Sequence, residues 1–129
     1  MKSLAREQSA ADLSDGTLRF LFLLAVLGNP DPPPVIAIDE PDTGLHPGIL
    51  PIIAEYATAA ATRAQVILTT HSPALLDAFR EATPTITVVG SAEGKTHLQV
   101  LSDEKLAYWL KQYTLGEIFR TGELEAMEP

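Results

Sequence analysis

The sequence contains no cysteine, few basic residues and no apolar run of membrane-spanning length. Without cysteine the chain forms neither disulfides nor a cysteine-ligated metal site, which fits a reducing, cytoplasmic environment. Its longest apolar stretch, 20–27, is far shorter than the roughly 18 residues that a membrane span needs, so it predicts a buried helix. The 9 Lys and Arg against 17 Asp and Glu give a net charge of -8, which argues against a broad nucleic-acid-binding surface.

A phosphate-binding loop is also missing. Such a P-loop reads Gly, four residues, then Gly-Lys-Ser or Gly-Lys-Thr, so that successive backbone N–H groups surround the phosphates before a helix begins. Gly94, Lys95 and Thr96 match only its end, because Val89 stands where the first glycine is required. The residues after Thr96 alternate like a strand and carry no helical pattern. We therefore interpret 94–96 as part of a hairpin turn.

Strand and helix patterns alternate along the chain, whose 129 residues suffice for one domain. Apolar runs at 35–38 and 66–70 predict two strands, and a hairpin is expected from 85–89 and 96–100. Expected helices are 17–27, 47–62, 73–81 and 103–113, and 115–119 and an acidic tail follow the last of them. This order predicts an α/β fold with parallel strands, flanking helices, and a C-terminal hairpin and helix.

Two adjacent carboxylates, Asp39 and Glu40, directly follow the first strand. Open α/β sheets bind ligands at the carboxyl ends of their strands. An aspartate followed by a glutamate suits Mg-nucleotide hydrolysis, in which one carboxylate holds the metal through water and the other activates the attacking water. A plain acidic loop is the structural alternative. A metal-dependent hydrolase with Asp39, Glu40, Asp42 and His46 as ligands is a third interpretation.

The stretch 39–47, in which Asp-Glu-Pro is followed by Leu-His-Pro, resembles the ABC-type ATPases of the AAA family, in particular the RecF-like and SMC-like branch. Ser14 and Gly16, at the start of the first apolar helix, resemble the signature motif of this family, although Asp15 stands where a glycine is common. Thr-Thr-His-Ser-Pro at 69–73 resembles its switch-histidine motif. The resemblance spans about 13–79 and implies the C-terminal half of a P-loop NTPase core.

The resemblance implies roles for these motif residues, with ATP and Mg²⁺ as ligands. Asp39 would hold water around Mg²⁺, Glu40 would polarise the attacking water, and His71 would sense the γ-phosphate. Ser14 and Gly16 would contact the γ-phosphate held by the opposite subunit of a head-to-tail homodimer.

The loop from Asp42 to His46 would reach across that dimer interface. For His46 a capping or packing role before Pro47 is equally compatible with the sequence. Some members of this branch serve DNA repair or chromosome organisation, but this acidic chain gives no indication that it binds DNA.

In this family the P-loop precedes the signature motif, and the sequence lacks it. We therefore expect 1–129 to be a single partial ATPase domain that needs an N-terminal P-loop portion or a partner chain, and to be inactive alone. The alternative is a non-catalytic dimerisation or regulatory module. Absent neighbouring strands would leave exposed sheet edges, which predicts self-association.

Overall fold

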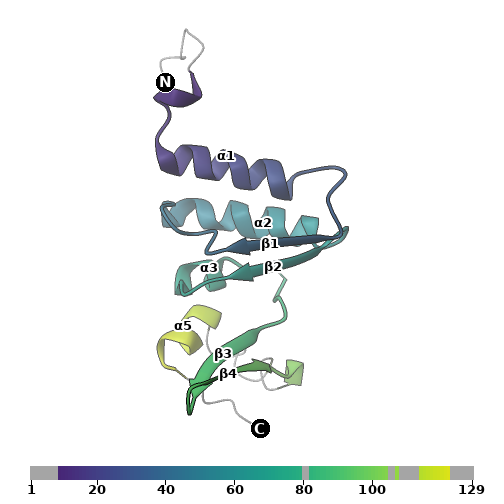
Figure 1. Ribbon diagram of the computed structural model, residues 1–129, viewed down its shortest axis with the longest axis vertical. Coiled ribbons are helices and arrows are strands. Elements are labelled where there is room, and N and C mark those ends of the chain that lie inside the picture. Colours follow the sequence, from purple (N-terminus) through teal and green to yellow (C-terminus); the bar gives the residue numbers. More distant parts are fainter. Residues whose placement is uncertain (1–8, 80–81, 105–106, 108–113, 123–129) are drawn as a thin grey trace. The chain divides into compact units, whose positions relative to one another are not determined.

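The computed structural model describes residues 9–79, 82–104, 107 and 114–122, and these show the expected alternation of strand and helix (Figure 1). The expected helix 103–113 and the acidic tail lie largely outside the described residues. The chain divides into two units, Met1–Thr70 and His71–Pro129. The elements are η1 Ala10–Asp12, α1 Asp15–Leu27, β1 Val35–Asp39, η2 Pro47–Ile49, α2 Leu50–Ala60, β2 Gln65–Thr69, α3 Pro73–Ala78, β3 Thr87–Ala92, β4 Lys95–Val100 and α5 Leu115–Arg120.

Strands β1 and β2 pair in parallel, as the sequence predicts, in a register that sets Val35 beside Gln65 and Asp39 beside Thr69. The backbone N–H of Gln65 donates to the carbonyl of Pro34 at 2.8 Å, so pairing begins where the proline-rich loop ends. Because parallel strands share one direction, their carboxyl ends lie at the same end of the sheet. Asp39 lies at this carboxyl end.

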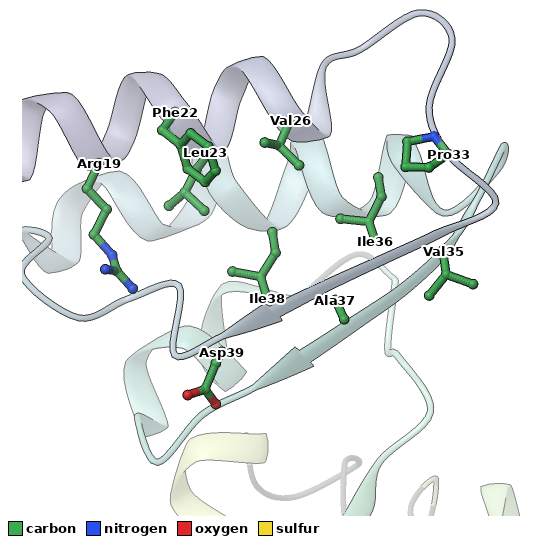
Figure 2. A pocket seen from close by; sticks show the side chains of 10 residues that line it. All are labelled: Arg19, Phe22, Leu23, Val26, Pro33, Val35, Ile36, Ala37, Ile38 and Asp39. Atoms are coloured by element: carbon green, nitrogen blue, oxygen red, sulfur yellow. The ribbon is translucent and has the colours of Figure 1, made fainter.

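Helices α1 and α2 lie on the same side of the β1–β2 sheet (Figure 1). Side chains alternate between the faces of a strand, and Ile36 and Ile38 point toward α1 (Figure 2). The core of this unit consists of the buried residues Leu23, Leu27, Ile36, Leu50, Ile53, Ala54, Ala57 and Ala60. Three of these residues on α2 are alanines, whose small side chains let the helix approach its neighbours closely.

Helix α1 is less covered than its composition predicts. Leu18, Leu21 and Phe22 are 37%, 48% and 63% exposed, so the expectation of a buried helix is wrong for the described chain. The described part of this unit supplies only one strand pair and α2 as packing partners, which is too little surface to cover an all-round apolar helix. No helix among the described residues is long and apolar enough to cross a membrane.

The second unit packs α5 against α3 around the buried residues Leu101, Leu115 and Ile118. Strands β3 and β4 pair antiparallel, which confirms the hairpin. Its turn contains only Glu93 and Gly94, with φ of 52° and 72°, instead of the six-residue connection expected from the sequence. A two-residue turn with positive φ at both positions matches the twist of the strands, so pairing continues further than the apolar pattern suggests.

Candidate functional site

Thr69, the last residue of β2, and Thr70, which follows it, hold acidic residues at and just after the end of β1. Thr69 Oγ1 donates a hydrogen bond to Asp39 Oδ1 and accepts one from the backbone N–H of Glu40 at 3.1 Å. Thr70 Oγ1 donates to Asp42 Oδ1 at 2.9 Å. The sequence analysis includes both threonines in the motif at 69–73 but does not predict that they contact Asp39, Glu40 and Asp42, although two polar residues at the end of an apolar strand were a usable signal.

Glu40 adopts a left-handed backbone conformation, with a φ of 44°. For a residue with a side chain this costs about 1–3 kcal/mol and persists only where the surroundings hold it. Its carbonyl accepts hydrogen bonds from Arg19 Nη2 at 2.7 Å and from the N–H of Thr43 at 3.1 Å. Its carboxylate accepts a further bond from Thr43 Oγ1 at 3.2 Å. Both the backbone and the side chain of Glu40 are therefore restrained.

The loop 40–46 lies directly against the first turn of α1. A Cβ added at Gly16 would lie 2.8 Å from the carbonyl oxygen of Gly44, closer than real Cβ atoms come to such an oxygen. Gly44 itself has a φ of +76°, which favours glycine. Glycine at both positions thus permits this contact between the helix and the 40–46 loop.

His46 caps the short helix η2. Its Nδ1 accepts a hydrogen bond from the backbone N–H of Gly48 at 3.0 Å. The structure therefore supports the capping alternative for His46. Among the described residues, no three His, Cys, Asp or Glu side chains lie close enough together to hold a metal ion. The metal centre considered from Asp39, Glu40, Asp42 and His46 does not form.

Asp39 instead offers a carboxylate beside a threonine hydroxyl. Mg²⁺ prefers oxygen ligands and usually keeps several waters, with one or two carboxylates and substrate phosphates completing its shell. The exposed carboxylate of Asp39 and its neighbour Thr69 fit such a sparse oxygen site.

Ser14 is the N-cap of α1. Its Oγ accepts a hydrogen bond from the N–H of Thr17 at 3.2 Å and also bonds the Thr17 hydroxyl at 2.8 Å. The first turn of a helix has N–H groups without intrahelical partners and carries the positive end of the helix dipole, so it favours an anion. Ser14 is exposed, and this end of α1 lies beside the 40–46 loop through the Gly16 contact.

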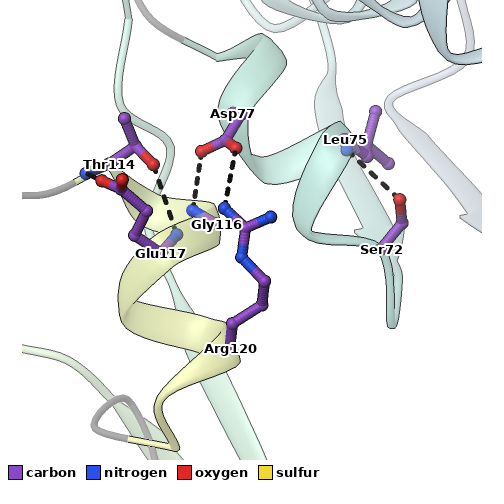
Figure 3. Close-up of polar contacts among 7 residues, drawn as sticks. All are labelled: Ser72, Leu75, Asp77, Thr114, Gly116, Glu117 and Arg120. Atoms are coloured by element: carbon purple, nitrogen blue, oxygen red, sulfur yellow. Dashed lines mark hydrogen bonds and ion pairs between the residues drawn. The ribbon is translucent and has the colours of Figure 1, made fainter.

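His71 is the first residue of the second unit and is exposed. It directly precedes Ser72, whose Oγ caps α3 by accepting a hydrogen bond from the N–H of Leu75 at 3.4 Å (Figure 3). Helix α3 is tied to α5 by Asp77, whose Oδ1 accepts the N–H of Gly116 at 2.8 Å. The structure thus brings Ser14 and Gly16 together with the 40–46 loop in one unit, whereas an approach of these residues to His71 stays a prediction.

An open groove of about 470 Å³ lies between α1 and β1 (Figure 2). Its lining is mostly apolar, with Arg19 and Asp39 at one end. Strand β1 pairs only with β2 among the described residues, so its other edge is unpaired along this groove. A strand edge beside an apolar helix face is the arrangement that a further strand can extend.

Comparison with known proteins agrees with this geometry. Residues 3–77 match a family described as "AAA domain, putative AbiEii toxin, Type IV TA system". No curated protein matches the sequence. A solved structure of an SMC ATPase, described by its ATP-driven dimerization and DNA-stimulated activation, aligns with a TM-score of 0.58 at 18% identity. The alignment covers 84% of this chain and 66% of that one, so this chain spans just under two thirds of its length. The chain belongs to this family of AAA domains and has the α/β fold of a P-loop NTPase.

Proposed function

We propose that this chain supplies the hydrolytic half of an ABC-type, RecF-like ATPase, in which its two units form one partial ATPase domain. The observation that carries the proposal is the paired acidic end of β1, where Asp39 and Glu40 are held by Thr69 of the neighbouring strand. Membership of the AAA family supports nucleotide chemistry at this carboxyl end of the sheet. The proposed setting is cytoplasmic.

Each residue contributes a distinct action to ATP hydrolysis. Asp39 orients the water shell of Mg²⁺, which when bound neutralises the charge that develops on the phosphates. Glu40 accepts a hydrogen bond from the attacking water and draws its proton away. His71 donates a hydrogen bond to the γ-phosphate, and Asp42 positions the loop that meets the second subunit.

The two nucleotide sites of the proposed homodimer are composite. Ser14 and Gly16 present the N-terminus of α1 to the γ-phosphate held by the other subunit, because unpaired N–H groups and the helix dipole both favour an anion there. ATP then joins the subunits, and hydrolysis releases them. Dimerization of the SMC ATPase by ATP supports this arrangement by analogy of fold.

A P-loop from outside this sequence completes the site, on the same polypeptide or on a partner chain. Without it the β- and γ-phosphates lack their main anchor. The unpaired edge of β1 and the apolar groove beside α1 support the addition of further strands. The missing P-loop equally favours the alternative, a non-catalytic dimerisation or regulatory module with the same fold.

Equilibrium binding of a fluorescent ATP analogue with Mg²⁺ separates these functions. We expect 1–129 alone to bind weakly or not at all, and a fusion carrying the P-loop half of a related RecF-like ATPase before Met1 to bind and hydrolyse ATP. In the fusion, Glu40→Gln should abolish hydrolysis while binding remains, and His71→Ala should weaken both. Glu55→Gln, an exposed glutamate on α2, is the matched control. A folded fusion that binds ATP without hydrolysing it would favour the regulatory module.

A further inference from the structure

Arg19 lies in the second turn of α1, and its guanidinium points toward the chain that follows β1 (Figure 2). Its Nη2 donates a hydrogen bond to the carbonyl oxygen of Glu40 at 2.7 Å in partly buried surroundings. Its Nε is buried and has no hydrogen-bond partner among the described residues. The contact joins Arg19 on α1 to Glu40, which lies 21 positions further along the chain.

This placement of a charged group is costly. Burial of a guanidinium N–H without a partner loses its hydration, and no carboxylate in the described part of the chain forms an ion pair with Arg19. The arginine therefore gains its direct polar contact from one backbone carbonyl. Hydrogen bonds from a charged donor are stronger than neutral ones, so this contact strongly restrains the peptide group that it reaches.

The restrained peptide group is the one that follows the left-handed residue Glu40. Its φ of 44° is an unfavourable conformation for a glutamate. Thr69 fixes the peptide N–H on the other side of the residue, through its carbonyl at 3.1 Å and its hydroxyl at 3.1 Å. With both neighbouring peptide groups held, the direction in which the Glu40 side chain leaves the backbone is set.

We propose that Arg19 is a positioning residue, which holds Glu40 in its left-handed conformation and so aims its carboxylate. Helix α1 touches the same loop a second time, where Gly16 meets the carbonyl of Gly44. The N-terminal half of α1 and the 40–46 loop are thereby linked at two points within one chain. A movement of α1 is transmitted to the Glu40 carbonyl through the Arg19 guanidinium.

The catalytic consequence rests on the proposed function. In that dimer, Ser14 at the start of α1 belongs to one ATP site and Glu40 to the other, so Arg19 connects the two sites. When a γ-phosphate occupies the first site, it then orders Glu40, the general base of the second site.

Hydrogen exchange of the full chain without nucleotide tests the positioning itself. We expect Arg19→Met, which keeps the aliphatic stem, to speed exchange of the amides in the 40–46 loop by about tenfold, the factor for loss of one charge-assisted hydrogen bond. The amides of α2 should be unchanged. Arg63→Met removes a weaker, exposed contact of the same kind, from Arg63 Nη1 to the Pro30 carbonyl at 3.4 Å, and should leave the 40–46 loop unaffected.

A double-mutant cycle separates positioning from packing. Glycine adopts a left-handed conformation without strain. In a Glu40→Gly background we therefore expect Arg19→Met to change the exchange of the 40–46 loop far less than tenfold. Exchange in Arg19→Met equal to that of the wild type, or an equal effect in both backgrounds, would overturn the proposal.

Kinetics of the P-loop fusion test the catalytic consequence independently. Arg19→Met should lower kcat about tenfold or more with KM unchanged, because the ground-state contacts to ATP remain. An unchanged kcat, in a fusion that Glu40→Gln inactivates, would refute this consequence while the ATPase function stands. A fusion without any hydrolysis would instead refute the ATPase function, and the exchange experiment would still decide whether Arg19 positions Glu40.

Discussion

Replacement of Gly16 with alanine sets two opposing free-energy terms against each other. In a helix interior, alanine is favoured over glycine by about 1 kcal/mol, and in the first turn the gain is smaller. The new Cβ would lie 2.8 Å from the carbonyl oxygen of Gly44, which is part of the backbone and not the end of a flexible side chain. The loop that carries this oxygen is held by the hydrogen bond from the N–H of Thr43 to the carbonyl of Glu40 at 3.1 Å.

The steric term should dominate. Overpacking by one methyl group in a restrained position costs about 1–3 kcal/mol, so we expect Gly16→Ala to lower the free energy of unfolding by about 1–2 kcal/mol. Urea unfolding of 1–129, followed by far-UV circular dichroism at a fixed protein concentration, measures this change. Hydrogen exchange should show the loss concentrated in the 40–46 loop and the first turn of α1.

Gly90→Ala is the matched control. Gly90 lies on β3 with a φ that suits any residue, and a Cβ there would have no atom within 4 Å. Because glycine in a strand interior costs about 0.5–1 kcal/mol relative to alanine, this substitution should leave stability unchanged or raise it slightly. Equal stabilisation by Gly16→Ala and Gly90→Ala would refute the reasoning, since the loop would then retreat from α1 at no cost.

Two further predictions concern the second unit and the exposed face of α1. Asp77→Ala leaves the buried N–H of Gly116 without its 2.8 Å acceptor and should cost about 1–3 kcal/mol in urea unfolding. Arg120→Ala removes only a 4.0 Å ion pair from a side chain that is 59% exposed and should change stability by less than about 0.5 kcal/mol; equal losses would contradict this ranking. Wild-type 1–129 should self-associate in sedimentation velocity, and Phe22→Lys should reduce that association because Phe22 is 63% exposed and lines the apolar groove between α1 and β1. Leu98→Lys on β4 should have less effect, because Leu98 is 73% exposed but does not line that groove.

The local elements followed from the sequence because their signals lie within a few residues. Ser14 marked the start of α1, and its side chain caps that helix. The proline at position 73 marked the start of α3 directly after Ser72. The hairpin was predicted correctly but its turn was not, because a two-residue turn depends on the positive φ of Glu93 and Gly94 and not on an apolar pattern.

The candidate site was only partly predictable. Asp39 and Glu40 stood out because two carboxylates followed an apolar strand. Thr69 escaped notice because its role depends on the parallel register, which sets it beside Asp39 across 30 positions of sequence. No role was predicted for Arg19, since nothing near it in the sequence indicates a contact with Glu40.

The sequence by itself determined the order of strands and helices, the helix caps and the motifs of the AAA family. These depend on side-chain alternation, hydroxyl caps and short spacings, which act within one or two turns of chain. Only the tertiary structure decided that Arg19 holds the Glu40 carbonyl and that Gly16 meets Gly44. It also decided that Glu40 is left-handed. Such contacts depend on how a helix and a sheet edge pack together, and local chain preferences do not specify that packing.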